Sequence, residues 1–352
     1  MTYKGILKLV FVILMASMVL LACERDVAIP KEATPFEVKL IIPSNFPQPV
    51  YNFEDNPLTK AGFILGRKLF YDPKLSRDNS ISCGSCHQSF AGFAHSEHRL
   101  SHGINGQFGT RNSPGLSNLI WQKTFMWDGG VNHIELQPLA PIANPVEMDE
   151  KMDNIITKLT ASEEYRNAFK TVFGDEKIDT KRIMLALTQF MGMLNSYNSR
   201  YDKYVRGESD GSFSKEELNG LNLFRSKCAS CHTEPLFTDN SFHNNGLPID
   251  PVLNDIGRMK ITQNVADSMV FKTPSLRNVD VTAPYMHDGR FKTLKLVLAH
   301  YTNGIHTSST LDPKLLNGIA LTPQEQNDII RFLQTLTDYS FITDERFAEP
   351  IN

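Results

Sequence analysis

This sequence has few cysteines, a small net charge and no long hydrophobic run. Only five of the 352 residues are cysteine, and a formal net charge of −3 gives no reason to expect nucleic-acid binding. The N-terminal apolar run, Leu9 to Ala22, is too short for a membrane-spanning helix, which needs about 20 residues. With 41% hydrophobic and 21% charged residues, the composition predicts a folded soluble body of two ordinary domains.

Residues 1–22 are predicted to be a cleaved export signal. Lys4 and Lys8 precede the apolar run, and no acidic residue occurs in this segment. The run ends in Leu-Leu-Ala followed by Cys23, which resembles a bacterial lipobox; an ordinary signal peptide with a chance cysteine is the alternative. A lipid on Cys23 would hold the protein at a membrane surface without spanning it. We therefore expect an exported, periplasmic or cell-envelope protein with residues 23–45 as a tether.

The other four cysteines all lie in two C-x-x-C-H motifs. They are Cys83-Gly84-Ser85-Cys86-His87 and Cys228-Ala229-Ser230-Cys231-His232. This motif attaches c-type haem: two thiols bond the porphyrin vinyl groups, and the histidine becomes an axial iron ligand. A zinc site would need further ligands at finger spacing, and no third cysteine lies near either motif. The sequence predicts two covalent haems, with His87 and His232 as proximal ligands and no cysteine left for a disulfide.

Helical periodicity surrounds both motifs, and strand signals are sparse. The expected helices lie at 58–71, 148–173 and 180–204, with two more starting at capping boxes, Ser214 to Glu217 and Thr322 to Glu325. The long irregular stretch between His87 and Met148 suits a loop wrapped around a haem. We predict a mainly α fold of two tandem cytochrome c-like domains with long haem-wrapping loops, at residues 46–205 and 206–352.

Several segments around the two motifs carry a family resemblance. They are Leu65-Gly66-Arg67-Lys68-Leu69-Phe70-Tyr71-Asp72-Pro73, Gly109-Thr110-Arg111-Asn112-Ser113-Pro114, Trp127-Asp128-Gly129, Gln137-Pro138-Leu139-Ala140-Pro141, Asn144-Pro145-Val146-Glu147-Met148, Phe271-Lys272-Thr273-Pro274-Ser275-Leu276-Arg277-Asn278-Val279 and Thr282-Ala283-Pro284-Tyr285-Met286-His287-Asp288-Gly289. In this order and spacing the chain resembles the bacterial di-haem cytochrome c peroxidase family, including its MauG-like branch. The resemblance covers roughly Pro57 to Tyr339.

The resemblance implies a peroxide-binding haem in the N-terminal domain and an electron-supplying haem in the C-terminal domain. Gln137 and Glu147 would stand on the open side of the first haem, and Pro141 would shape its pocket. A carboxylate there can move a proton between the two peroxide oxygens. The alternative for Glu147 is a surface residue capping a helix that starts near Met148. Trp127 matches the family's tryptophan between the haems, although without that context it is simply a core residue.

Two positions depart from the usual peroxidase pattern. Where many relatives have a removable distal histidine, this chain has Ile104, so we expect the first haem to be open opposite His87. The alternative is that His102, two residues away, replaces the missing histidine. Where a methionine ligates the second haem, this chain has Tyr301, as in MauG-like proteins, and Met286 is the competing ligand. A tyrosinate ligand would lower the haem potential relative to methionine. The candidates for a sixth ligand from sequence are His95, His98, His102, Met126, Met286, His287, His300 and Tyr301.

The resemblance also implies a calcium ion and a set of partners. Asn112, Thr282 and Pro284 match an inter-domain calcium site of oxygen ligands. The implied activity is reduction of hydrogen peroxide to water with electrons from a small cytochrome or cupredoxin, and a homodimer is compatible with the family. One alternative is a MauG-like enzyme that oxidises a protein side chain, supported by Tyr301. The other is a non-enzymatic di-haem electron carrier.

Overall fold

The computed structural model describes residues 37–350. The predicted signal peptide, Cys23 and most of the 23–45 tether lie outside the described residues. Within 37–350, no helix combines the length and apolar character needed to cross a membrane. The residues from Val38 onward form one compact unit.

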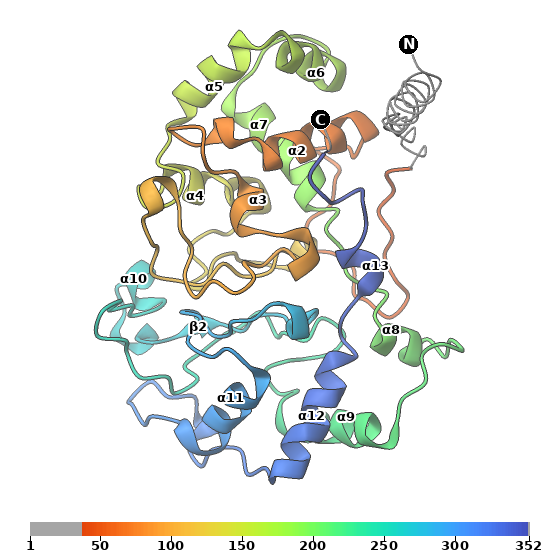
Figure 1. Ribbon diagram of the computed structural model, residues 1–352, viewed down its shortest axis with the longest axis vertical. Helices are drawn as coiled ribbons and strands as arrows, with labels where there is room; N and C mark the ends of the chain where they lie inside the picture. The colour runs from red at the N-terminus through yellow and green to blue at the C-terminus, as the bar shows by residue number, and fades with distance from the viewer. Residues whose placement is uncertain (1–36, 351–352) are drawn as a thin grey trace, which may run out of the picture. The chain divides into compact units, whose positions relative to one another are not determined.

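Each half of this unit is built around one pair of packed helices. In the first half α2 (Lys60–Tyr71) packs against α7 (Thr180–Met191), and in the second α9 (Lys215–Lys227) packs against α12 (Pro323–Gln334) (Figure 1). The other helices are α3 (Cys83–Cys86), α4 (Leu139–Ala143), α5 (Met152–Ala161), α6 (Glu163–Phe173), α8 (Arg200–Val205), α10 (Met259–Thr262), α11 (Leu294–Ala299) and α13 (Tyr339–Ile342). Two short strands, β1 (Phe242–His243) and β2 (Phe271–Lys272), pair antiparallel. The predicted mainly α fold is confirmed.

A glycine stands at the crossing of each helix pair. A β-carbon on Gly66 of α2 would overlap the carbonyl oxygen of Ala186 on α7, and one on Gly220 of α9 would overlap that of Asp328 on α12. Only glycine lets the two backbones approach this closely. Both halves thus use the same device to pack their helices, as expected for two copies of one type of domain.

Two predicted helices are shorter than expected. The 148–173 segment forms two helices, α5 and α6, because Ser162 ends the first and caps the second with its hydroxyl. The 180–204 segment is helical only to Met191, and the chain then crosses extended toward the second half before α8 begins. Both capping boxes are confirmed, at Ser214 for α9 and at Thr322 for α12.

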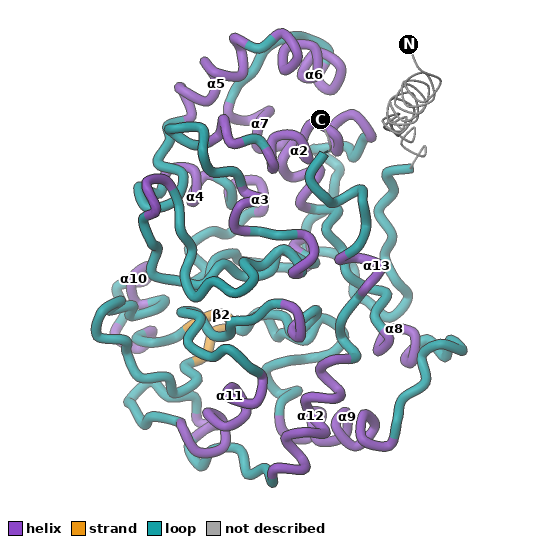
Figure 2. Tube along the Cα trace, in the orientation of Figure 1, coloured by secondary structure: helices purple, strands orange, loops and turns teal. Residues whose placement is uncertain are grey.

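Loops form most of the chain between α3 and α4. Figure 2 shows this stretch as a series of loops and short turns. Isolated bridges such as Gln88 to Ala94 and His102 to Phe108 hold it together in place of regular sheets. The predicted irregular stretch is therefore confirmed, and its wrapping of a haem stays a prediction.

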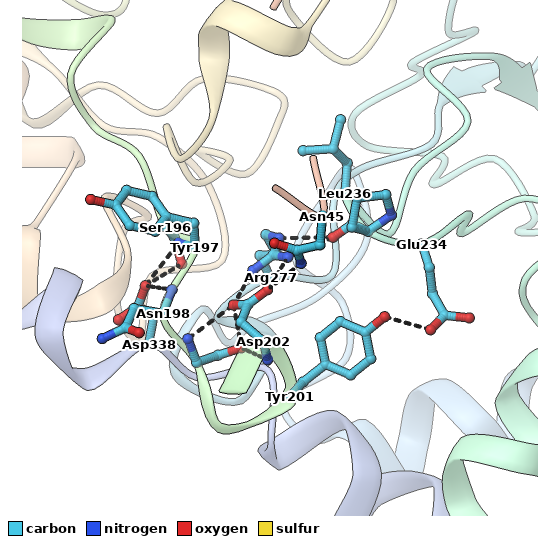
Figure 3. Close-up of polar contacts among 12 residues, drawn as sticks. Asn45, Ser196, Tyr197, Asn198, Tyr201, Asp202, Glu234, Leu236, Arg277 and Asp338 are labelled. Atoms are coloured by element: carbon cyan, nitrogen blue, oxygen red, sulfur yellow. Dashed lines mark hydrogen bonds and ion pairs between the residues drawn. The ribbon is translucent and has the colours of Figure 1, made fainter. Parts of the chain in front are cut away.

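A buried ion pair holds the segment that connects the two halves. Arg277 donates to both carboxylate oxygens of Asp202 at 2.8 Å, and also to the carbonyl of Pro235 at 2.7 Å (Figure 3). Both charged side chains have no exposed surface. Next to this pair, Asp338 accepts from the backbone N–H of Asn198 at 2.8 Å. The connecting segment is therefore fixed by charged groups of the second half.

The C-terminal residues return to the first half. Arg67 of α2 donates to the carbonyl of Ala348 at 2.7 Å, and the Tyr71 hydroxyl donates to that of Phe347 at 2.7 Å. The Phe347 ring also packs against buried aromatic rings of α2 and α7. The chain after α12 thus completes the core of the first half, and the boundary at 205/206 remains a prediction.

Candidate functional site

One cavity of about 1210 Å³ runs along both C-x-x-C-H motifs. His87 lines it from the first half, and Cys228, Cys231 and His232 line it from the second. The four motif cysteines are all unpaired. Burial raises the pKa of the Cys83 thiol to about 12. The thiols of both motifs are therefore free to form the thioether bonds that the motif predicts.

The two motif histidines are oriented in the same way. His87 Nδ1 lies 2.7 Å from the carbonyl oxygen of Phe93, and His232 Nδ1 lies 3.1 Å from that of Phe237. Because a carbonyl only accepts, each Nδ1 carries the proton and each Nε2 is left to bind a metal. Both phenylalanines are fully buried with positive φ, 62° and 56°, a conformation that costs energy in a residue of this size. That shared conformation directs both carbonyls at the imidazoles.

The cavity wall also carries a buried cation with no acidic partner. Lys272 on β2 is 9% exposed, and its ammonium donates to Gln122 Oε1 and to the carbonyl of Thr124. No carboxylate pairs with it in the described part of the chain. Burial lowers the pKa of Lys272 to about 7. A haem brings two carboxylates into such a cavity, so the thiols, the histidines and this lysine together fit c-type haem.

Glu147 faces the cavity on the side of the first motif, together with Gln137 and Pro141. The Ser101 hydroxyl donates to Glu147 Oε1 at 2.9 Å. Burial raises the pKa of Glu147, and the Ser101 and Asn144 hydrogen bonds oppose that rise. The helix after it starts only at Met152, with Lys151 as N-cap. Glu147 therefore does not cap that helix, and the helix-cap alternative is wrong.

Ser101 is held in place by backbone contacts that the sequence analysis did not foresee. Its N–H donates to the carbonyl of Arg111, and its own carbonyl accepts from the N–H of Gly109, both at 2.8 Å. A β-carbon on Gly109 would overlap the Ser101 hydroxyl. The loop backbone therefore positions this hydroxyl on the Glu147 carboxylate.

Trp127 lies between the two halves. Its indole N–H donates to the carbonyl of Asn112 at 2.8 Å, and its own carbonyl accepts from the N–H of Lys272 at 2.7 Å. The ring packs on a buried cluster formed by Leu247, Met269 and Phe271 of the second half. The structure thus brings Trp127 to the wall shared by both motifs.

Tyr301 and Met286 both line the cavity, but their surroundings differ. Tyr301 belongs to a single π-helical turn, His300–Gly304, a local irregularity that often marks functional positions. Burial raises its pKa to about 12, the Asn245 side chain opposes that rise, and the nearby Cys228 and Cys231 add to it. The Met286 sulfur already accepts a hydrogen bond from Asn245 Nδ2 at 3.3 Å.

The remaining sixth-ligand candidates divide into two groups. Met126 and His287 also line the cavity. Four histidines are not part of its lining, namely His95, His98, His102 and His300. The His300 Nε2 is engaged by the Asn245 carbonyl at 2.9 Å. The structure therefore gives no support to His102 as a substitute distal ligand.

Asn112, Thr282 and Pro284 come together on the same wall. The Asn112 side-chain amide donates to the carbonyls of His98 and Arg99 at 3.1 and 3.2 Å. Both contacts use the N–H groups of the amide, and both acceptors lie in one loop. The amide oxygen remains as the atom suited to a hard cation.

Comparison with known proteins agrees with this geometry. A model of the di-haem cytochrome c peroxidase family matches residues 60–210. The methylamine utilization protein MauG of Methylorubrum extorquens is 35% identical over 301 residues, 82% of each chain. The cytochrome c551 peroxidase of Nitrosomonas europaea is 36% identical over 278 residues, 78% of this chain and 79% of its own. The chain belongs to the di-haem cytochrome c peroxidase family.

A solved structure supports the MauG-like side of this family. The crystal structure of a MauG-like protein associated with microbial copper homeostasis has a TM-score of 0.80 and 33% identity, covering 88% of this chain and 98% of that one. The predicted fold class, the predicted two c-type haems and the predicted haem peroxidase class are confirmed by the family. The calcium ion and the lipid anchor stay predictions.

Proposed function

We propose that this chain reduces hydrogen peroxide to water at the first motif, with electrons that a small cytochrome or cupredoxin delivers to the second. The observation that carries the proposal is Glu147, half-buried over the cavity that His87 lines, with its carboxylate held by the Ser101 hydroxyl. When bound at His87 and His232, the two haems would supply the redox chemistry for peroxide cleavage and for electron delivery.

Glu147 performs the proton transfer that this cleavage needs. One carboxylate oxygen, Oε1, is held by Ser101, and the carboxylate takes a proton from one peroxide oxygen and returns it to the other. The oxygen that receives it leaves as water. Burial favours the neutral acid once the proton has been taken, and the Ser101 hydrogen bond keeps the charged form accessible. Gln137, from the same wall, orients the peroxide with its amide.

Trp127 provides the contact between the two redox centres. Its hydrogen bonds to both halves fix the indole in one orientation, and its ring is the polarisable group at that wall. At the second motif we propose Tyr301 as the sixth ligand, because it lines the cavity on a π-helical turn, close to the motif cysteines Cys228 and Cys231. A tyrosine ligand favours ferric iron and lowers the potential.

Three further features belong to the same proposal. A calcium ion bound by Asn112, Thr282 and Pro284 would join the two halves near Trp127. The leader supports export to the periplasm or cell envelope with a lipid on Cys23. A homodimer is compatible with the family.

A second candidate function is oxidation of a side chain in a partner protein. Tyr301 favours it, because a tyrosine at this position is the MauG-like feature, and the chain is similar to MauG over 82% of its length. The proton-transfer role of Glu147 would be the same in both reactions.

Two measurements test the proposal. Electron paramagnetic resonance of the haem-loaded protein should show one high-spin ferric signal from the open first site. Two low-spin ferric signals in the oxidised protein, with no high-spin signal after partial reduction, would indicate an electron carrier instead. Steady-state turnover with a reduced small cytochrome and peroxide should then be catalytic. An open site without turnover would favour the protein-oxidising enzyme.

A further inference from the structure

Three histidines form a cluster on the loop that follows the first motif. The rings of His95 and His98 stack with centroids 4.1 Å apart, and His102 lies 4.8 Å from each. One ring nitrogen from each residue lies within 4.8 Å of the other two. The cluster combines a buried, an exposed and an intermediate side chain, so it opens to solvent on one side.

His95 carries a polar atom that nothing satisfies. The side chain is 2% exposed, and its Nδ1 has no hydrogen-bond partner among the described residues. A buried, unpaired nitrogen costs stability unless a ligand occupies it. Neutral imidazole is the form that binds metals.

The other two histidines suit the same role. His98 Nδ1 lies 2.9 Å from the carbonyl oxygen of Ser96, which leaves Nε2 to face a ligand. The loop itself is anchored, since the Asn112 amide donates to the carbonyls of His98 and Arg99. None of the three histidines lines the haem cavity. The cluster therefore lies beside the first motif, whose Cys86 Sγ is 3.5 Å from the His102 carbonyl oxygen, with its side chains outside the cavity lining.

We propose that His95, His98 and His102 bind one divalent first-row transition-metal ion of the Zn²⁺ or Cu²⁺ type. Three imidazoles are the ligand set such ions prefer, whereas Ca²⁺ and Mg²⁺ prefer oxygen. Zinc–nitrogen bonds of roughly 2.0–2.1 Å place tetrahedral ligands roughly 3.3 Å apart. The imidazole nitrogens lie within 4.8 Å of one another, and to bind one ion the exposed His98 ring must turn out of its stack with His95. The fourth position, on the open side, is left to water.

An ion here would also stabilise the loop that supports the catalytic carboxylate. His102 directly follows Ser101, whose hydroxyl donates to Glu147 Oε1. The next residues also contact Glu147, since the N–H of Ile104 donates to its carbonyl at 2.9 Å. The metal site does not depend on peroxide reduction, because it is formed by the loop alone.

Calorimetric titration of the haem-loaded chain with ZnCl₂ tests this proposal. The buffer contains calcium, so that an oxygen-ligand site does not contribute to the heat. We expect one equivalent of zinc per chain, and His98→Ala and His102→Ala should weaken binding at least about 10- to 100-fold. The matched control is His306→Ala, another exposed histidine outside the cluster, which should bind as the unaltered protein does. Bound Cu²⁺ should show hyperfine splitting from nitrogen ligands in its paramagnetic resonance spectrum.

Two results would overturn the proposal. One is the absence of stoichiometric zinc binding by the unaltered protein. The other is binding that both His98→Ala and His102→Ala leave unchanged, which would assign the zinc to some other surface group. His98 is exposed, so its substitution should preserve folding, and the haem absorption spectrum checks this.

Discussion

Glu147 and Ser101 should behave as one unit in the reaction with peroxide. Glu147→Gln keeps the shape and the acceptor oxygen but removes proton transfer, which typically contributes about 10²- to 10⁴-fold in rate. Ser101→Ala removes one hydrogen bond to a carboxylate, 2.9 Å long and half-buried. Such a bond contributes about 1.5–3 kcal/mol, or roughly 10- to 150-fold if it is fully expressed in the transition state. The serine variant should therefore be impaired, but less than the glutamine variant.

A double-mutant cycle separates this coupling from general damage. The rate of the peroxide reaction is measured by stopped flow in both single variants, in the double variant, and in Ser209→Ala, an exposed serine that serves as control. Ser101→Ala should lose most of its effect in the Glu147→Gln background, because a neutral amide gains less from the hydroxyl than a carboxylate does. Loss of the hydrogen bond also raises the pKa of Glu147 further, so the acid limb of the rate profile should move to higher pH. An unchanged rate in Glu147→Gln would refute the proton-transfer role, and additive effects would refute its coupling to Ser101.

Three other predictions follow from named contacts. Asp202→Ala should lower the free energy of unfolding by about 3–5 kcal/mol, because it leaves Arg277 charged and buried. Thermal unfolding measures this change, and the control Asp210→Ala, at an exposed position, should change the stability little. Tyr301→Met should raise the potential of the second haem in a redox titration, and an unchanged potential would remove the tyrosine from the iron. Trp127→Phe should slow steady-state turnover while the first reaction with peroxide keeps its rate; a slower first reaction would place the tryptophan in the peroxide site instead.

The helix starts were predictable because their signals are local. A capping box places donor and acceptor three residues apart, so Ser214 and Thr322 mark α9 and α12 from sequence alone. The break between α5 and α6 was not predictable from periodicity. Both helices bury large hydrophobic side chains at helical spacing, such as Leu159 before the break and Tyr165 after it, so the periodicity continues through the break. Only the hydroxyl of Ser162, a weak signal by itself, marks the change of direction.

The site residues also divide into those that a local motif predicts and those that depend on contacts between distant segments. The thiols and histidines of each motif are fixed by a five-residue pattern, so they could be assigned without a structure. Ser101 could not, because it lies 46 residues from Glu147 and reaches it only through the pairing of its own backbone with Gly109 and Arg111. Asn245 was missed for the same reason. Its side chain donates to the Met286 sulfur and also contacts Tyr301, so it connects the two ligand candidates that the sequence left open.

Asn112 shows why these separate contacts act together. Its N–H donates to the carbonyl of His287 in the second half at 2.7 Å, and its carbonyl accepts from the Trp127 indole at 2.8 Å. Its side chain holds the loop that carries His98. One buried residue therefore connects the tryptophan, the second half and the loop that leads to Ser101. A cation on its remaining amide oxygen would stabilise all three at once, so the proposed calcium ion would set the position of Trp127 rather than take part in the chemistry.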